Sequence, residues 1–457
     1  MLLDAVSPPL PYNEPWKARL DERIRMLGWG DRHVAYFYEN PDTSTFRYRI
    51  YNMIEALNAE PERGISAAWF TLADLARSLD FLDRADVLVI CRTRYDDMVG
   101  RLVSRARARR LRVLYDVDDL IFDPTYTHLI ADTLDLKLRS SADWDSWFAY
   151  IARLGATLRL CDGAITTNAR LARCIAEYAA WIEPRIVPNF LNRRQTEISR
   201  RLYERKRDGD FHRDGRIHVG YFSGSPTHNK DFRIAASALA KLLAKELRLR
   251  LRVVGFLDPQ SELMLYRDRI ETYPLQDFIN LQRLQAEVEL NIAPLQSNIF
   301  TNCKSELKYF EAGIVGTVTI ASPTPNFVGV IEDGENGFLA SAHDWQEKIA
   351  QVVALLDDDP QTYAAMVENA FGHAQRDYGW NRQAAAIEAA LFGELPARNS
   401  GSSLQQCSRG ECAAIAPPEA SLNPPQRHAP ISHISRSSGG VWSRGARSMP
   451  RVGFWQG

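Results

Sequence analysis

Short apolar runs alternate with longer amphipathic stretches along most of this chain, and the alternation occurs twice. The clearest runs of the first half are Asp86–Cys91 and Leu111–Tyr115, and those of the second half are Ile217–Phe222 and Leu249–Val254. Short runs that are mainly apolar predict strands buried largely on both faces, and the amphipathic stretches predict the helices that cover them. The pattern therefore predicts two α/β units, each built on a parallel sheet.

Shorter apolar runs complete both predicted sheets. In the first half we expect further strands at residues 35–38, 67–70, 163–166 and 186–187. In the second half we expect them at residues 278–280, 290–293, 317–321 and 338–340. The segment 192–215 between the two units is highly charged and almost free of apolar runs, so we interpret it as a linker.

Composition limits the function classes. The 457 residues suggest two or three domains, and the net charge of −1 gives no reason to expect a nucleic-acid partner. The six cysteines form no CxxC pair or zinc spacing, which predicts reduced thiols in a cytoplasmic protein. The N-terminus lacks the apolar core of a signal peptide, and no run has the length of a membrane helix. Peripheral contact with the inner membrane face stays compatible with the sequence.

The composition changes again near the C-terminus. A helical stretch over residues 376–394 follows the second unit, and we expect it to pack back on the first. Residues 395–457 are rich in Ser, Pro, Gly and Arg, and they contain Cys407 and Cys412. Because such a tail cannot bury enough apolar area to offset its chain entropy, we expect it to be disordered.

The stretch from Ser297 to Ser322 predicts a loop, a helix, a tight turn and a strand. On a helix Lys304, Lys308 and Glu311 would share one face, because they are spaced at i, i+4 and i+7. Cations at the start of a helix beside a sheet edge suit an anionic ligand. The alternative is a solvated face with a weak ion pair.

A second candidate anion site is the strand-to-helix loop between Phe222 and Lys230. Its small residues, Gly224 and Ser225 among them, allow backbone N–H groups to approach an anion closely. Lys230 supplies a positive charge at the start of the next predicted helix. The loop has neither a Walker A nor a GxGxxG pattern, so a plain connection is the alternative.

Charged residues also follow the strands of the first half. Arg47 and Arg94 could meet phosphate or carboxylate groups, or they could be surface charge. Asp116 and Asp118 form a DxD pattern, which is compatible with a divalent metal that holds a diphosphate. Together with Asp119 they could instead contact hydroxyls or act as a base, or cap a helix.

Several of these segments resemble one family. GYFSGSPTHNKDF, VVGFLDP, NIFTNCKSELKYFEAGIVGTVTIASPT and IEDGENGFLA resemble the nucleotide-sugar half of family 4 (group 1) glycosyltransferases with the GT-B fold. FRYRIYNMIEAL and YDVDDLIFDP are similar to the acceptor half of members that build bacterial polysaccharides. The resemblance extends over about residues 30–393. It implies two Rossmann-like domains facing across a cleft, which we place at 1–205 and 206–375, followed by the 376–394 helix.

The resemblance also implies an activity, which is transfer of a sugar from a nucleotide-diphosphate sugar with retention and with no required metal or other cofactor. The acceptor would be a glycan or lipid-linked glycan in cell-surface polysaccharide biosynthesis, for example of O-antigen. Lys230 and Lys304, together with the dipole of a helix beginning near Cys303, would stabilise the leaving diphosphate. Asp118 and Asp119 are candidates for the acceptor hydroxyl.

The family motif assigns further residues. Glu311 corresponds to the glutamate that binds the donor ribose, and Gly224, Ser225, His228 and Ser305 fall beside the donor diphosphate. On the acceptor side, the candidates for anchoring an anionic carrier are Arg47 and Arg94. Cys303 stands where many members have a first glutamate that touches the donor sugar. That departure leaves donor identity open.

Three other functions are compatible with these residues. A single-domain, metal-dependent GT-A transferase would use Asp116 and Asp118. A GT-B epimerase would act on the nucleotide sugar without an acceptor. A non-catalytic partner in a polysaccharide-assembly complex would bind nucleotide sugar or glycan without turnover, and the cysteine at position 303 is compatible with it.

Overall fold

The computed structural model describes residues 8–394 apart from 42–43, 76–78, 210, 212–214, 226 and 259. The strands of the first half are β1 (Arg32–Tyr38), β2 (Ile65–Thr71), β3 (Val87–Cys91), β4 (Arg112–Val117), β5 (Gly163–Thr166) and β6 (Pro184–Ile186). Those of the second half are β7 (Ile217–Ser223), β8 (Leu249–Gly255), β9 (Ile270–Tyr273), β10 (Leu290–Ala293), β11 (Val318–Ala321) and β12 (Phe338–Leu339). They form two six-stranded sheets, ordered β2-β1-β3-β4-β5-β6 and β12-β11-β10-β7-β8-β9.

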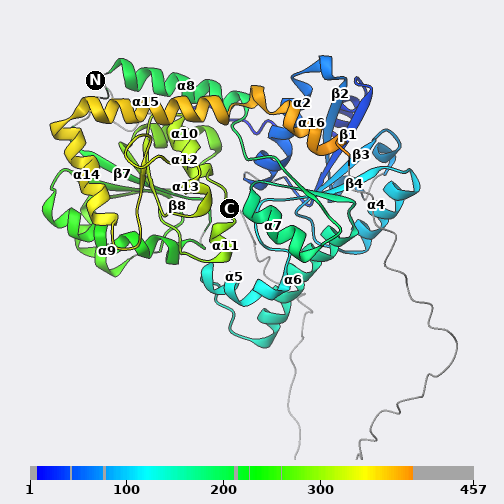
Figure 1. Ribbon diagram of the computed structural model, residues 1–457, viewed down its shortest axis with the longest axis horizontal. Helices are drawn as coiled ribbons and strands as arrows, with labels where there is room; N and C mark the ends of the chain where they lie inside the picture. The colour runs from blue at the N-terminus through cyan, green and yellow to red at the C-terminus, as the bar shows by residue number, and fades with distance from the viewer. Residues whose placement is uncertain are drawn as a thin grey trace, which may run out of the picture. The chain divides into compact units, whose positions relative to one another are not determined.

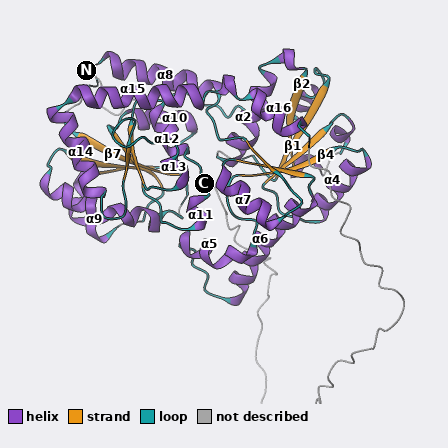
Figure 2. Ribbon diagram, viewed as in Figure 1, coloured by secondary structure: helices purple, strands orange, loops and turns teal. Residues whose placement is uncertain are grey.

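All pairings between these strands are parallel (Figures 1 and 2). Successive residues of β1 alternate between two apolar cores, with Val34 and Tyr36 in one and Ala35 and Phe37 in the other. This alternation shows that the first sheet is covered on both faces. The two α/β units predicted from the sequence are therefore confirmed.

Helices connect the strands of each sheet. The first half has α1 (Leu20–Met26), a π-helical turn η1 (Arg47–Tyr51), α2 (Asn52–Asn58), α3 (Leu72–Leu75), α4 (Asp97–Ala108), α5 (Thr127–Thr133), α6 (Ser141–Leu160) and α7 (Ala169–Tyr178). The second has α9 (Asn229–Lys245), a 3₁₀ segment η5 (Ser261–Arg269), α10 (Phe278–Ala286), α11 (Ile299–Asn302), α12 (Leu307–Gly313), α13 (Pro325–Val328), α14 (Trp345–Asp358) and α15 (Pro360–Asp377). Because the strands are parallel, the loops after their carboxyl ends gather at one edge of each sheet.

The prediction of a linker at 192–215 is wrong, because most of this segment forms the helix α8 (Arg193–Asp208). Asn192 caps it by accepting a hydrogen bond from the Gln195 N–H at 2.8 Å. One narrow stripe of the helix is buried, and Tyr203 on that stripe stacks on Phe371 of α15 with ring centroids 3.7 Å apart. The two helices run side by side in Figure 1. A single buried stripe is enough to hold an otherwise highly charged helix.

Two further predictions about the second half are also wrong. Residues 278–280 begin the helix α10 rather than a strand, because the Asp277 carboxylate accepts hydrogen bonds from the N–H groups of Ile279 and Asn280. The helix expected to contain Lys304 is interrupted, since α11 ends at Asn302 and α12 begins at Leu307. Lys304 therefore lies in the loop between two short helices.

The chain returns to the first half after α15. The helix α16 (Ala384–Phe392) packs against α2, and its Glu388 carboxylate pairs with Arg32 at 2.6 Å and Arg63 at 2.8 Å. Arg112 donates to the carbonyl of Leu391 at 2.7 Å. The predicted disordered tail, 395–457, lies outside the described residues. Within the described part of the chain, no helix has both the length and the apolar character needed to cross a bilayer.

A buried ion pair joins the π-helical turn η1 to the central strand β4. The Arg49 guanidinium donates to both carboxylate oxygens of Asp116, at 2.8 and 2.9 Å, and both side chains are almost completely buried. Arg49 also donates to the carbonyl of Val187 at 2.8 Å and to Asn189 Oδ1 at 3.2 Å. One side chain thus ties the turn after β1 to strand β4 and to the segment after β6.

We expect Arg49→Ala to lower the free energy of unfolding by about 3–5 kcal/mol, because it leaves the Asp116 carboxylate buried and unpaired. Arg200→Ala is the control, since Arg200 makes an exposed pair with Glu204 and its loss costs about 0–1 kcal/mol. Denaturant unfolding followed by circular dichroism measures both. Equal losses in the two variants would contradict the importance of the Arg49–Asp116 pair.

Candidate active site

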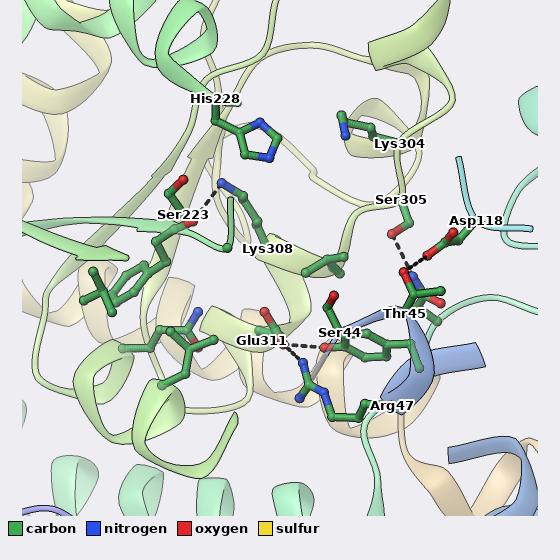
Figure 3. Close-up of a pocket in the computed structure, with 18 of the residues that line it drawn as sticks. Ser44, Thr45, Arg47, Asp118, Ser223, His228, Lys304, Ser305, Lys308 and Glu311 are labelled. Atoms are coloured by element: carbon green, nitrogen blue, oxygen red, sulfur yellow. Dashed lines mark hydrogen bonds and ion pairs between the residues drawn. The ribbon is translucent and has the colours of Figure 1, made fainter. Parts of the chain in front are cut away.

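One pocket is lined by residues from both halves of the chain (Figure 3). From the first half it receives Ser44, Thr45, Arg47, Tyr48, Asp118, Asp119 and Asn189. From the second half the polar residues lining it are Ser223, His228, Gln276, Gln285, Lys304, Ser305, Lys308 and Glu311. Asp118 and Asp119 follow strand β4, and Ser223 ends strand β7, so the pocket lies where carboxyl ends of strands from the two sheets face each other.

Glu311 is a buried carboxylate on α12 that two first-half side chains contact. Arg47 Nη2 donates to its Oε1 at 3.2 Å, as a dashed line in Figure 3 shows. The Tyr48 hydroxyl donates to the same oxygen. Burial, reinforced by the Glu311 carboxylate, raises the pKa of Tyr48 well above its usual value, so this hydroxyl stays protonated and keeps donating. Arg47 and Tyr48 therefore join the two halves through a single carboxylate.

The second half also contributes a basic wall. Lys308, also on α12, donates to the carbonyl of Phe222 at 2.9 Å, and burial lowers its pKa to about 8. Lys304 lies in the loop before α12, with its Nζ 3.6 Å from Asp119 Oδ1. His228 faces the same space in Figure 3, and burial lowers the pKa of its ring although Asp231 lies 3.0 Å from Nδ1. At neutral pH the wall thus presents two cationic amines and a neutral imidazole.

The first half contributes an acidic wall, which meets the basic wall where Asp119 approaches Lys304. Asp118 accepts from Arg92 at 3.0 Å and from the Thr45 hydroxyl at 3.2 Å, and Asp119 lies 3.5 Å from the same guanidinium. Arg92 has a φ of +39°, in the left-handed region that non-glycine residues rarely adopt. Such a conformation costs about 1–3 kcal/mol and persists only where its surroundings enforce it. The contacts of Arg92 with Asp118 and Asp119 are part of these surroundings, and they keep both carboxylates beside one guanidinium.

Most of the predicted site residues meet in this pocket. Those that line it are Arg47, Asp118, Asp119, Gly224, His228, Lys304, Ser305 and Glu311. Ser305 accepts a hydrogen bond from Asn189 Nδ2 at 3.0 Å. Arg47 was expected on the acceptor side, but it contacts Glu311, which was predicted to bind the donor. The fold therefore brings together predicted residues that are more than 250 positions apart in the sequence, such as Arg47 and Glu311.

Three predicted residues are not among those lining the pocket. Lys230 pairs with Asp132 of α5 at 2.6 Å instead. Arg94 forms a two-point ion pair with Glu39, with nitrogen–oxygen distances of 2.8 and 2.6 Å. Ser225 hydrogen-bonds the Thr227 hydroxyl within its own loop. The sequence placed all three beside strand ends correctly, but it could not show which way their side chains point.

Asp116 is separated from its predicted DxD partner. Its carboxylate faces Arg49, and burial raises its pKa, whereas Asp118 faces Arg92 and Thr45. Asp116 belongs to strand β4, whereas Asp118 lies beyond the end of that strand at Val117, where the chain has left the sheet. The GT-A alternative, which needs both carboxylates in one single-domain site, does not fit this arrangement of two sheets.

Among the pocket residues that sequence reasoning missed, Lys308 and Tyr48 make the contacts that matter most for the site. Lys308 was noted only as part of a helical face, although it follows Lys304 by four positions and precedes Glu311 by three. That spacing was the available signal, because residues three apart on a helix share a face. Tyr48 gave no signal, since its neighbour Glu311 comes from the other half of the chain.

Cys303, at the position where the family resemblance placed a glutamate, is not among the residues that line the pocket. Its side chain is fully buried and belongs to an apolar core of the first half, together with Phe300. The loop therefore directs Cys303 into that core and the next two residues, Lys304 and Ser305, into the pocket.

Comparison with known proteins gives one family match, within the second half of the chain, and several solved structures with a similar fold. Residues 217–358 match the family model described as "Glycosyl transferases group 1". No curated protein sequence matches the chain. Among solved structures, Anabaena Alr3699/HepE in complex with UDP is 15% identical, covers 78% of this chain and 100% of its own, and has a TM-score of 0.50.

Two further structures have similar scores. WaaG, a glycosyltransferase involved in lipopolysaccharide biosynthesis, is 14% identical, with 79% of this chain and 100% of its own covered and a TM-score of 0.51. Sucrose-phosphate synthase from Thermosynechococcus elongatus is 14% identical, with 78% and 96% covered and a TM-score of 0.50. At these identities the likeness concerns the fold, which is GT-B, with two Rossmann-like units on either side of the pocket.

We expect Tyr48→Phe to lower the free energy of unfolding by about 1–3 kcal/mol, because it removes a donor from a buried carboxylate. The control is Tyr51→Phe, whose hydroxyl contacts the less buried Glu55 one turn away at 3.2 Å. Chemical unfolding compares the two variants, and we expect a loss below about 1 kcal/mol for the control. A Tyr48 variant as stable as the wild type would contradict the contact with Glu311.

Proposed function

We propose that this protein is a glycosyltransferase that moves a sugar from a nucleotide-diphosphate sugar to an acceptor hydroxyl. The observation that carries the proposal is the pocket in which Glu311, Lys304 and Lys308 of the second half face Asp118 and Asp119 of the first. The match of residues 217–358 to group 1 glycosyl transferases supports the donor side. A carboxylate beside two amines suits a ribose followed by a diphosphate, because a carboxylate accepts from two hydroxyls and amines pair with phosphate.

The proposed mechanism is electrostatic. As the bond from the sugar to the diphosphate breaks, negative charge accumulates on the leaving phosphate, and Lys304 and Lys308 stabilise it. The buried position of Lys308 strengthens this interaction, since charges interact more strongly away from water. We propose Lys308 for this role in place of Lys230, which the sequence suggested, because Lys308 lines the pocket and Lys230 is not among the lining residues. In this proposal two fixed amines do the work of a divalent ion, and no cofactor takes part.

Asp118 and Asp119 are proposed to receive the acceptor. Carboxylates held by Arg92 can accept hydrogen bonds from a sugar hydroxyl and orient it toward the donor.

We propose a glycan or lipid-linked glycan as acceptor, with retention of anomeric configuration, in cell-surface polysaccharide biosynthesis. The fold shared with WaaG, which is involved in lipopolysaccharide biosynthesis, supports this pathway. We propose that the protein acts in the cytoplasm, in contact with the membrane face where lipid-linked glycans are assembled.

A non-catalytic nucleotide-sugar-binding role is the second candidate. It is favoured by one observation, which is that Cys303 faces a core instead of the pocket, so the glutamate common in the family has no counterpart at this position. Product analysis with radiolabelled donors distinguishes the two functions. Binding of a donor without hydrolysis or transfer across a panel of glycan acceptors would favour the second.

The test of the transferase proposal begins with a thermal-shift panel of nucleotide sugars with and without EDTA, in which one donor raises the melting temperature in both conditions. With that donor, we expect Lys304→Ala to lower kcat at least about a hundredfold, since it removes a charge that stabilises the transition state. Lys241→Ala on the exposed face of α9 is the control. Near-normal turnover by a folded Lys304→Ala protein would overturn the proposed mechanism.

Binding of the leaving nucleoside diphosphate should depend on pH through Lys308. UDP, which the Anabaena structure contains, is the probe. Because the pKa of Lys308 is lowered to about 8, the amine is charged at pH 7 and mostly neutral at pH 9. If only the charged form binds, the Kd of UDP rises about tenfold over this range. Titration calorimetry measures it, and we expect a flatter profile for Lys308→Arg, which keeps its charge. Identical profiles would contradict the role of Lys308.

A further inference from the structure

Two cysteines from different halves of the chain lie against each other beside the pocket. Cys174 is on α7 of the first half, and Cys303 is in the loop between α11 and α12 of the second. Their sulfur atoms are 3.8 Å apart, and both side chains are buried. The proposed function uses neither thiol. Cys174 retains a small exposed fraction, 4%, whereas Cys303 has none.

The surroundings differentiate the two thiols. A hydrogen bond from the Cys303 thiol lowers the pKa of Cys174, and the nearby Arg170 guanidinium lowers it further. Arg170 Nε is buried and has no hydrogen-bond partner in the structure. Hydrogen bonding to Cys174 and burial raise the pKa of Cys303. Cys174 is therefore the thiol that ionises first and that a small reagent reaches first.

The backbone near Cys303 is anchored to the first half independently of the thiols. Asn168 Nδ2, at the start of α7, donates to the Cys303 carbonyl at 2.8 Å. Asn168 also caps α7 by accepting from the Leu171 N–H at 2.9 Å. The two sulfur atoms thus face each other across a fixed contact, and a disulfide requires them to approach by somewhat less than 2 Å, to about 2.0 Å.

We propose that Cys174 and Cys303 are a redox-active pair, which a peroxide oxidises to a disulfide that links the two halves and stops turnover. The Cys174 thiolate attacks one peroxide oxygen, the O–O bond breaks, and a sulfenic acid and hydroxide form. The Cys303 thiol then attacks the sulfenic sulfur and releases water as the S–S bond forms. The two thiols lose two electrons in total, the peroxide gains them, and two waters result after protonation of the hydroxide. A dithiol reverses the reaction by exchange.

The link would restrain the site because Cys303 precedes Lys304, which lines the pocket. Arg47, Tyr48 and Asp119 of the first half contact the second half around the same pocket. We infer that these contacts open when a large donor enters or leaves. A covalent bond beside Lys304 opposes that opening. The effect on turnover rests on the proposed transferase function, whereas formation of the disulfide does not.

The experiment treats the reduced full-length protein with hydrogen peroxide, blocks remaining thiols with N-ethylmaleimide and digests with trypsin. We expect mass spectrometry to find peptide 174–185 joined to peptide 284–304 by a disulfide that dithiothreitol cleaves. We expect turnover to fall at least tenfold on oxidation and to return with dithiothreitol. The Cys174→Ser variant should keep its turnover in peroxide.

Cys161→Ser is the matched control, because Cys161 is also buried in the first half and its thiol donates to the Thr157 carbonyl at 3.3 Å. We expect it to respond to peroxide like the wild type. Absence of the joined peptides, a link from Cys174 to another cysteine, or a complete link with unchanged turnover would overturn the proposal. A link in a protein that turns over no donor would instead count against the transferase function alone.

Discussion

The pocket depends on one carboxylate being shared between the two halves. Glu311 is buried on α12, and its oxygen accepts from Arg47 and Tyr48, which belong to the π-helical turn after β1. A buried carboxylate without partners would be strongly destabilising, so this contact favours the arrangement in which the two sheets face each other. The same turn carries Arg49, which holds Asp116 of the central strand β4. One turn of five residues therefore couples the first core to the second half.

This arrangement has a consequence for ligand binding. In the structure, the carboxylate proposed to bind the donor ribose already has two donors from the first half. A ribose hydroxyl must therefore either displace one of these donors from Oε1 or bind the other carboxylate oxygen. The Arg47 guanidinium also lies over the rings of Tyr48 and Phe278 at 4.3 and 4.9 Å, so displacing it would break cation–π contacts as well as the ion pair. Donor binding and the contact between the halves are thus energetically linked.

The sequence predicted the fold better than the directions of side chains. Apolar runs located most strands, because parallel strands buried on both faces are apolar throughout. The sequence analysis interpreted α8 wrongly, because its buried stripe is too narrow to stand out among charged residues. It also predicted a strand at residues 278–280, where the Asp277 cap favours a helix. Three charged residues lie near strand ends as expected, but each pairs with a residue that is distant in sequence or unmarked by any motif. The pairs are Lys230 with Asp132, Arg94 with Glu39, and Asp116 with Arg49. Such pairings follow from tertiary contacts that no local pattern records.

The loop between α11 and α12 shows why a family motif alone could not define this site. A continuous helix would have placed Lys304, Lys308 and Glu311 on one face. Instead α11 ends before Cys303, and helical structure begins again with α12 at Leu307. The break allows consecutive residues to serve different environments, with Cys303 in the core of the first half and Lys304 in the pocket. Glutamate at position 303 would place a charge in that apolar core, at a cost of several kcal/mol. The cysteine is therefore suited to its surroundings.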